Sequence, residues 1–138
     1  TRGIDAARAA YEEAGVKAEV TPFIEDMAQA YAEADLVICR AGALTVSELA
    51  AVGVGAVLVP FPAAVDDHQT ANAQFLVREG AAVLIADRDL TPARLAAELK
   101  VLCHRGKLLA MAERARLVAK PHAAQALAEA CLAQLEAA

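Results

Sequence analysis

The stretch RAGALTVSE, residues 40–48, lies between a predicted strand and a predicted helix. Residues 36–39 before it read LVIC, a short apolar run that is typical of a buried strand. Residues 44–52 carry a helical pattern that ends at Gly53. The chain therefore leaves a strand, turns through three small residues and enters a helix at once. Such a corner places free backbone N–H groups and the positive end of the helix dipole at the carboxyl edge of a sheet, where phosphates bind readily.

Glu48 is the strongest polar candidate for a ligand contact. It falls within the first two turns of this helix, where a carboxylate can accept hydrogen bonds from the hydroxyls of a sugar. An anion site beside a hydroxyl acceptor predicts a nucleotide or nucleotide-sugar ligand, with Thr45 and the amides of Ala43 and Leu44 at the phosphates. The alternatives are a solvated glutamate after an ordinary turn, and a Thr45 hydroxyl that bonds its own backbone.

Composition is typical of a compact α/β protein. The chain has 138 residues, of which 58% are hydrophobic and 22% charged, enough for a sizeable core. A net charge of −5 and the absence of Trp argue against a nucleic-acid partner. No apolar run approaches the roughly 18 residues of a membrane span. The isolated cysteines Cys39, Cys103 and Cys131 are predicted to be buried, reduced thiols.

Predicted strands and helices alternate four times. We expect strands at 18–21, 36–39, 56–59 and 82–85, and helices at 4–14, 27–34, 44–52, 70–79, 92–104 with Thr91 as its N-cap, 107–118 and from 122 onward. This order predicts an α/β fold, an open Rossmann-like parallel sheet with helices on both faces and a helical C-terminal tail. Loops that follow parallel strands share one edge, where ligands bind. Because the chain opens on a helix, we expect a fragment or one half of a split protein.

A proline-bounded loop at 60–62 leads to polar residues before the next helix. Residues 66–69 read DDHQ, but adjacent residues rarely converge on one ion, so we predict no metal site. Asp67 is expected to cap the helix, while His68 and Gln69 face the sheet edge. Asn72, one turn later, either supports the same patch or makes a local bond within its helix.

The sequence offers no catalytic centre of its own. No order of Ser, His and Asp, or of Cys and His, indicates a nucleophile. His68 is the sole candidate for a base, and His104 and His122 are predicted surface residues. We expect no cofactor.

Several ordered motifs run through nearly the whole chain. They are VTPFIEDM at 20–27, CRAGALTVSE at 39–48, VPFP at 59–62, DDHQTAN at 66–72 and MAERAR at 111–116. Together they resemble the MurG family of peptidoglycan GlcNAc transferases, two-domain GT-B enzymes. The resemblance covers only the later part of the C-terminal, donor-binding domain.

This resemblance implies transfer of GlcNAc from UDP-GlcNAc to lipid I, the undecaprenyl-pyrophosphoryl muramoyl-pentapeptide, at the cytoplasmic side of the bacterial inner membrane. The chain would be a single UDP-GlcNAc-binding domain, residues 1–138, soluble by itself. The acceptor site, the membrane-docking patch and the catalytic His belong to the family's N-terminal domain, so we expect this chain to be inactive alone. Two alternatives stay open: a donor-binding subunit that needs a partner chain, and an α/β interaction module without a ligand.

The resemblance also implies donor-binding residues. The backbone of Ile24 would bind uracil in a pocket lined by Phe23 and Met27. Glu48 would bind the ribose hydroxyls, and His68 and Gln69 would contact the GlcNAc. The full set of implied contacts is Phe23, Ile24, Met27, Gly42, Ala43, Leu44, Thr45, Glu48, His68, Gln69 and Asn72.

Overall fold

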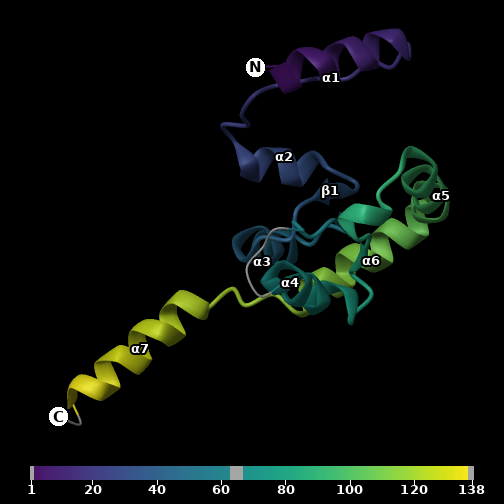
Figure 1. Ribbon diagram of the computed structural model, residues 1–138. Helices are drawn as coiled ribbons and strands as arrows, with labels where there is room; N and C mark the ends of the chain where they lie inside the picture. Colours follow the sequence, from purple (N-terminus) through teal and green to yellow (C-terminus); the bar gives the residue numbers. More distant parts are fainter. Residues whose placement is uncertain (1, 63–66, 137–138) are drawn as a thin grey trace. The chain divides into compact units, whose positions relative to one another are not determined.

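The computed structural model describes residues 2–62 and 67–136 (Figure 1). Two compact units make up the chain, Thr1–Ala30 and Tyr31–Ala138. In chain order the elements are α1 Arg2–Glu13, α2 Met27–Glu33, β1 Val37–Cys39, α3 Ala43–Val52, β2 Ala56–Leu58, α4 His68–Val77, β3 Ala82–Leu84, the 3₁₀ helix η2 Asp87–Asp89, α5 Pro92–Leu102, α6 Arg105–Leu117 and α7 Ala123–Glu136.

The second unit holds a three-stranded parallel sheet in the order β1-β2-β3. Val57 of β2 pairs with Ile38 on one side and with Val83 on the other. All three strands run in one direction, so the loops that follow them meet at a single edge. This confirms the predicted open parallel sheet.

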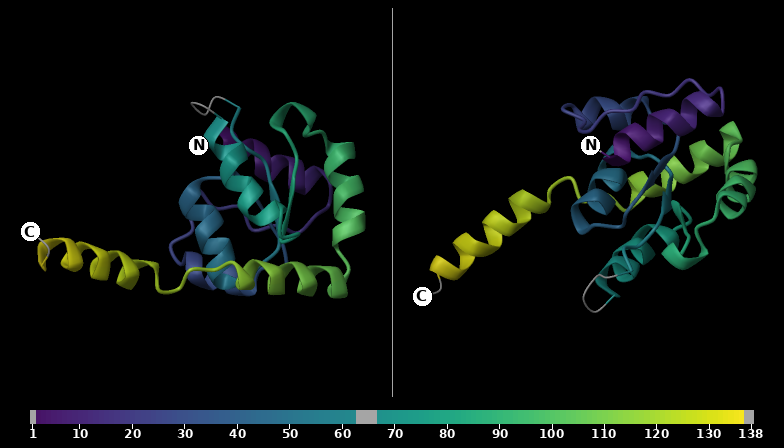
Figure 2. Two further views of the ribbon diagram at one scale, coloured as in Figure 1. Left: turned by 90° about the horizontal axis from the view of Figure 1, so that it is seen from below. Right: turned by 45° about the horizontal axis from the view of Figure 1, so that its top comes forward.

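Helices cover both faces of this sheet, as predicted (Figure 2). Successive strand residues point to opposite faces, so Leu58 packs in a cluster with Leu49 of α3 and Leu76 of α4. Val57 packs on the other face with Leu102 of α5, in a cluster that also includes Met111 of α6. Burial of each such aliphatic side chain stabilises the fold by about 1.5–3 kcal/mol. These two clusters hold the strand ends in place.

Two glycines turn the helices of the first face back into the sheet. Gly53 follows α3 with φ 78°, and Gly80 follows α4 with φ 68°, a left-handed conformation that costs other residues energy. The next residue in each case donates its amide five residues back, Val54 to Leu49 and Ala81 to Leu76. Each helix therefore stops close to the strand that follows it.

The predicted strand at 18–21 is wrong. Within the described residues no strand pairs with this segment, and strand formation depends on such a neighbour. The Val20 carbonyl instead accepts a hydrogen bond from the Arg8 guanidinium at 3.0 Å. Strand and helix thus alternate three times in the structure. The helix after this segment begins as predicted, because the Asp26 carboxylate accepts from the Gln29 amide at 2.8 Å.

The cysteine prediction is also wrong in part. Cys39 is half-buried, but Cys103 and Cys131 are exposed. Cys103 lies at the C-terminal end of α5, and Cys131 lies on α7, where all described side chains from Ala123 to Leu135 are exposed. No helix in the described part of the chain is long and apolar enough to cross a membrane.

Candidate functional site

The N-terminus of α3 lies at the carboxyl edge of β1 and is open. Gly42 stands at the N-cap with an extended backbone (φ −62°, ψ 147°), and no side chain caps the helix there. The first backbone amide that donates a hydrogen bond in this helix is that of Val46, which donates to the Gly42 carbonyl at 2.9 Å. The amides of Ala43, Leu44 and Thr45 therefore have no acceptor among the described residues. These donors are available to an anion.

Glu48 stands one and a half turns further along α3, with its carboxylate exposed. One oxygen, Oε2, accepts a hydrogen bond from the Tyr31 hydroxyl at 3.1 Å. Tyr31 is buried, and this burial, together with the hydrogen bond and the charge of Glu48, raises the pKa of Tyr31 to about 12. The phenol thus stays protonated and orients the carboxylate. Sequence reasoning did not identify Tyr31, because its pairing with Glu48 depends on how α2 and α3 pack.

Thr45 is half-buried, and its hydroxyl makes no hydrogen bond within the described residues. The alternative in which it bonds its own backbone is therefore wrong. Leu44 beside it is 80% exposed. Leu44 and Glu48 border an open cavity of about 380 Å³, which Phe75 of α4 and Lys120 also line.

The start of α4 differs from the prediction. The helix begins at His68, two residues earlier than expected, and His68 is exposed. Asp67 stands at the N-cap, but its side chain makes no cap hydrogen bond, so the predicted capping role is wrong. Asp67 has φ 51°, outside the extended conformation from which an N-cap side chain reaches its helix. Asp66 lies outside the described residues.

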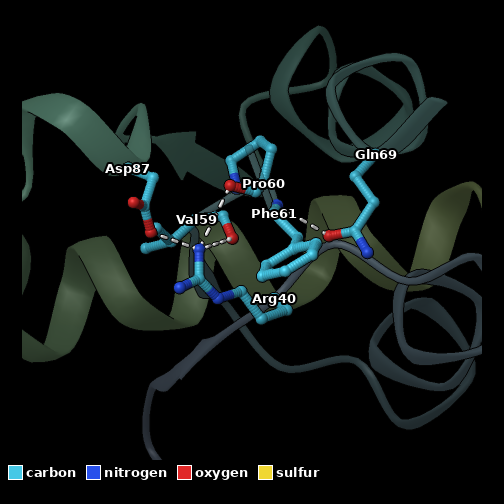
Figure 3. Close-up of polar contacts among 6 residues, drawn as sticks. All are labelled: Arg40, Val59, Pro60, Phe61, Gln69 and Asp87. Carbon is cyan, nitrogen blue, oxygen red and sulfur yellow. Dashed lines mark hydrogen bonds and ion pairs between the residues drawn. The ribbon is translucent and has the colours of Figure 1, made fainter. Parts of the chain in front are cut away.

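Two side chains of α4 form hydrogen bonds with neighbouring loops. The Asn72 side-chain amide donates to the Ala41 carbonyl at 3.2 Å, so it ties α4 to the corner before α3 and is not engaged within its own helix. The Gln69 side-chain oxygen accepts from the Phe61 amide at 2.9 Å (Figure 3). Through these two bonds, α4 connects the loop after β1 with the loop after β2 at one sheet edge.

Arg40 and Asp87 lie at the carboxyl edge of the sheet, and the sequence analysis gave neither of them a role. Arg40 follows β1 directly, Asp87 follows β3, and their side chains form an ion pair at 2.5 Å (Figure 3). The sequence signal for this ion pair was the presence of opposite charges just after two strands of one predicted parallel sheet. The pair spans β2, so recognising it required the strand order as well.

The predicted uracil-binding residues belong to the other unit. Phe23 is 75% exposed, Ile24 and Met27 are also exposed, and Met27 begins α2. The Thr21 hydroxyl donates to the Phe23 carbonyl at 2.7 Å, which shapes this segment locally. The role of these three residues in a common site stays a prediction.

No group of three or more His, Cys, Asp or Glu side chains in the described ranges could hold a metal ion. His104 and His122 are exposed, as predicted. Cys39 does not provide a nucleophile, because burial raises the pKa of its thiol to about 11 and keeps it protonated at neutral pH.

Residues 4–129 match the glycosyltransferase family 28 C-terminal domain. The chain belongs to this family. The motifs predicted the family of the MurG transferases and its C-terminal domain. Both predictions are confirmed. This chain is also similar to a solved structure, a MurG from Acinetobacter baumannii, with 51% identity and a TM-score of 0.87. The similarity covers 91% of this chain and 37% of the solved one.

Curated relatives share one name, UDP-N-acetylglucosamine--N-acetylmuramyl-(pentapeptide) pyrophosphoryl-undecaprenol N-acetylglucosamine transferase. The relative from Marinobacter nauticus is 59% identical over 132 residues, which is 95% of this chain and 36% of that protein. The relative from Azoarcus sp. is 62% identical over 128 residues, again covering 36% of its length. The family 28 chain thus spans about a third of the curated relatives it matches.

Proposed function

We propose that this chain binds the donor UDP-GlcNAc for a glycosyltransferase of peptidoglycan synthesis. The observation that carries the proposal is the open N-terminus of α3 at the carboxyl edge of β1, with the Glu48 carboxylate on the same helix. Glu48 lies five residues beyond Ala43, about 7.5 Å along the helix axis. A nucleoside diphosphate bridges such a spacing, with its phosphates on the amides and its ribose at the carboxylate.

Each predicted residue then has a role in the bound donor. The amides of Ala43 and Leu44, with the free hydroxyl of Thr45, hold the diphosphate behind Gly42. Glu48 accepts from the ribose hydroxyls, and Tyr31 orients it. His68 and Gln69 contact the GlcNAc, and Asn72 ties their helix to the corner before α3. The uracil lies against Phe23, the backbone of Ile24, and Met27.

For the whole protein we infer transfer of GlcNAc to lipid I, which forms lipid II at the cytoplasmic side of the inner membrane. The donor and the acceptor come from the names of relatives that are more than twice as long as this chain, and the membrane side comes from the resemblance. We assign the lipid acceptor and the catalytic base to protein outside residues 1–138, either in the same polypeptide or in a partner chain. We therefore expect no lipid II from this chain alone, and detectable product in a lipid I assay would contradict that part of the proposal.

Calorimetric titration of the purified chain with UDP-GlcNAc, UDP-glucose and UDP tests donor binding directly. Preference for UDP-GlcNAc over UDP-glucose supports the complete site, including the sugar contacts. Equal affinity for all three ligands supports only a uridine-diphosphate pocket and contradicts the assignment of Gln69. Absence of binding at millimolar ligand contradicts donor binding by this chain and favours an interaction module.

A further inference from the structure

Arg40 joins the carboxyl ends of all three strands. It follows β1 in the sequence, and its Nη1 atom donates to the carbonyls of Val59 at 3.4 Å and Pro60 at 3.2 Å, just after β2. The same atom pairs with Asp87, just after β3, at 2.5 Å (Figure 3). One guanidinium thus connects three loops at the candidate site.

Phe61 continues this connection toward α4. Its ring lies under the Arg40 guanidinium, 5.5 Å from the guanidinium carbon to the ring centroid. Its backbone amide donates to the Gln69 side-chain oxygen at 2.9 Å. Because a backbone N–H needs an acceptor, Gln69 must turn its oxygen toward Phe61 and its NH₂ group away (Figure 3). Arg40 therefore holds the residue that decides how Gln69 is presented.

Stability alone is a poor explanation for this arrangement. The side chains of Arg40 and Asp87 are 49% and 34% exposed, and ion pairs this open to solvent contribute little to folding. The chain contains a simpler pair for comparison, Arg94–Glu98 on α5, at 3.0 Å and with the same exposure of its arginine. Among the described residues, neither side chain of that pair forms a hydrogen bond or ion pair with the loops after β1 and β2. It serves as a matched control.

We propose that Arg40, fixed by Asp87, is a positioning residue for the sugar of the donor. It acts through Phe61 on Gln69 and leaves the diphosphate and ribose contacts on α3 unchanged. The inference rests on the proposed function, since it assumes that Gln69 meets the GlcNAc. It predicts that loss of Arg40 reduces discrimination at the sugar while binding of UDP is preserved.

Arg40→Met removes the charge and the hydrogen bonds and keeps a side chain of similar length. We expect about a five- to tenfold loss in UDP-GlcNAc affinity, as for a lost hydrogen bond, with less than a twofold change for UDP. Arg94→Met should leave both affinities unchanged. Equal losses for UDP-GlcNAc and UDP would overturn the proposal, because they indicate general disruption. Unchanged affinities in Arg40→Met would overturn it as well.

A second measurement does not depend on donor binding. Amide hydrogen exchange of the ligand-free chain, followed by NMR, should accelerate at Phe61 about tenfold in Arg40→Met and stay unchanged in Arg94→Met. Unchanged exchange at Phe61 overturns the proposed connection even if UDP-GlcNAc binds. If the unaltered chain binds no UDP-GlcNAc, the proposed function fails and the sugar-positioning role with it. Accelerated exchange would then still establish that Arg40 holds the loop.

Discussion

The helices α3 and α5 begin in opposite ways. At α5 the Thr91 hydroxyl accepts from the Arg94 amide at 3.1 Å, and Pro92 occupies the first position, where no amide is needed. At α3 a glycine stands at the N-cap, and no side chain satisfies the first amides. The comparison teaches that the first amides of α5 are satisfied within the chain, whereas those of α3 have no acceptor among the described residues, as the proposed phosphate site requires. An open start is not sufficient by itself, since α4 and α6 also lack a side-chain cap. The difference is that only residues 40–42 separate α3 from the strand before it.

The largest expected effect follows from removing the hydroxyl acceptor on α3. Glu48→Ala should weaken UDP binding by about 1.5–3 kcal/mol, as expected for a hydrogen bond to a charged group. Calorimetry on the variant and on Glu113→Ala, an exposed glutamate of α6, measures the difference. Equal behaviour of the two variants would assign Glu48 to the solvated face.

Closing α3 artificially should separate stability from binding. Gly42→Asp fits the extended backbone, and its Cβ meets only the Thr45 hydroxyl oxygen, at 3.6 Å. The new carboxylate caps the amides, so we expect a gain of about 0.5–1 kcal/mol in unfolding free energy and a loss of about 1.4 kcal/mol in UDP binding. Gly106→Asp, in the first turn of α6 with open space around it, provides the control. Retained UDP affinity in Gly42→Asp would show that phosphates bind elsewhere.

Removing the side-chain cap of α5 should change stability and leave UDP binding unaffected. Thr91→Ala removes the cap and should lower the unfolding free energy by about 1 kcal/mol, with UDP affinity unchanged. Denaturant titration measures the loss, and Thr91→Ser, which keeps the hydroxyl, should restore most of it. A UDP affinity of Thr91→Ala below that of the unaltered chain would contradict the assignment of stability to the start of α5 and of binding to the start of α3.

The smallest effect concerns the support of α3. Tyr31→Phe removes the donor to Glu48, and we expect UDP binding to weaken by about 0.5 kcal/mol at neutral pH. Affinity equal to that of the unaltered chain would show that Glu48 needs no orientation by Tyr31.

Alkaline pH provides a second measurement on the same variant. The pKa of Tyr31 lies above its ordinary value of 10.0, at about 12, so its contribution to stability is complete below pH 10 and is lost as the pH approaches 12. Denaturant titrations from pH 8 to 12 should therefore show a smaller alkaline loss in Tyr31→Phe. The loss between pH 9 and 11 should persist, because Cys39 titrates with a pKa raised from 9.0 to about 11. An unchanged loss above pH 10 would contradict this account of Tyr31.

Much of the fold followed from local signals. Apolar runs predicted β1, β2 and β3, and Gly53 predicted where α3 stops. The end predicted for α4 from Gly80 was two residues too late, because α4 stops at Val77. The strand at 18–21 could not be judged in this way, because a strand is defined by a neighbour that the local sequence does not contain. The cap at Asp67 failed for a similar reason: a left-handed backbone at that position cancels the residue's usual preference.

The candidate site shows the same division. The sequence by itself determined the open corner at Gly42 and the place of Glu48 on α3, because strand, small-residue turn and helix start depend on consecutive residues. Only the tertiary structure decided that Tyr31 holds Glu48, that Asn72 holds Ala41, and that Arg40 reaches Asp87 across β2. Those contacts join residues 17 to 47 positions apart, and they exist because parallel strands in a definite order bring their carboxyl ends to one edge.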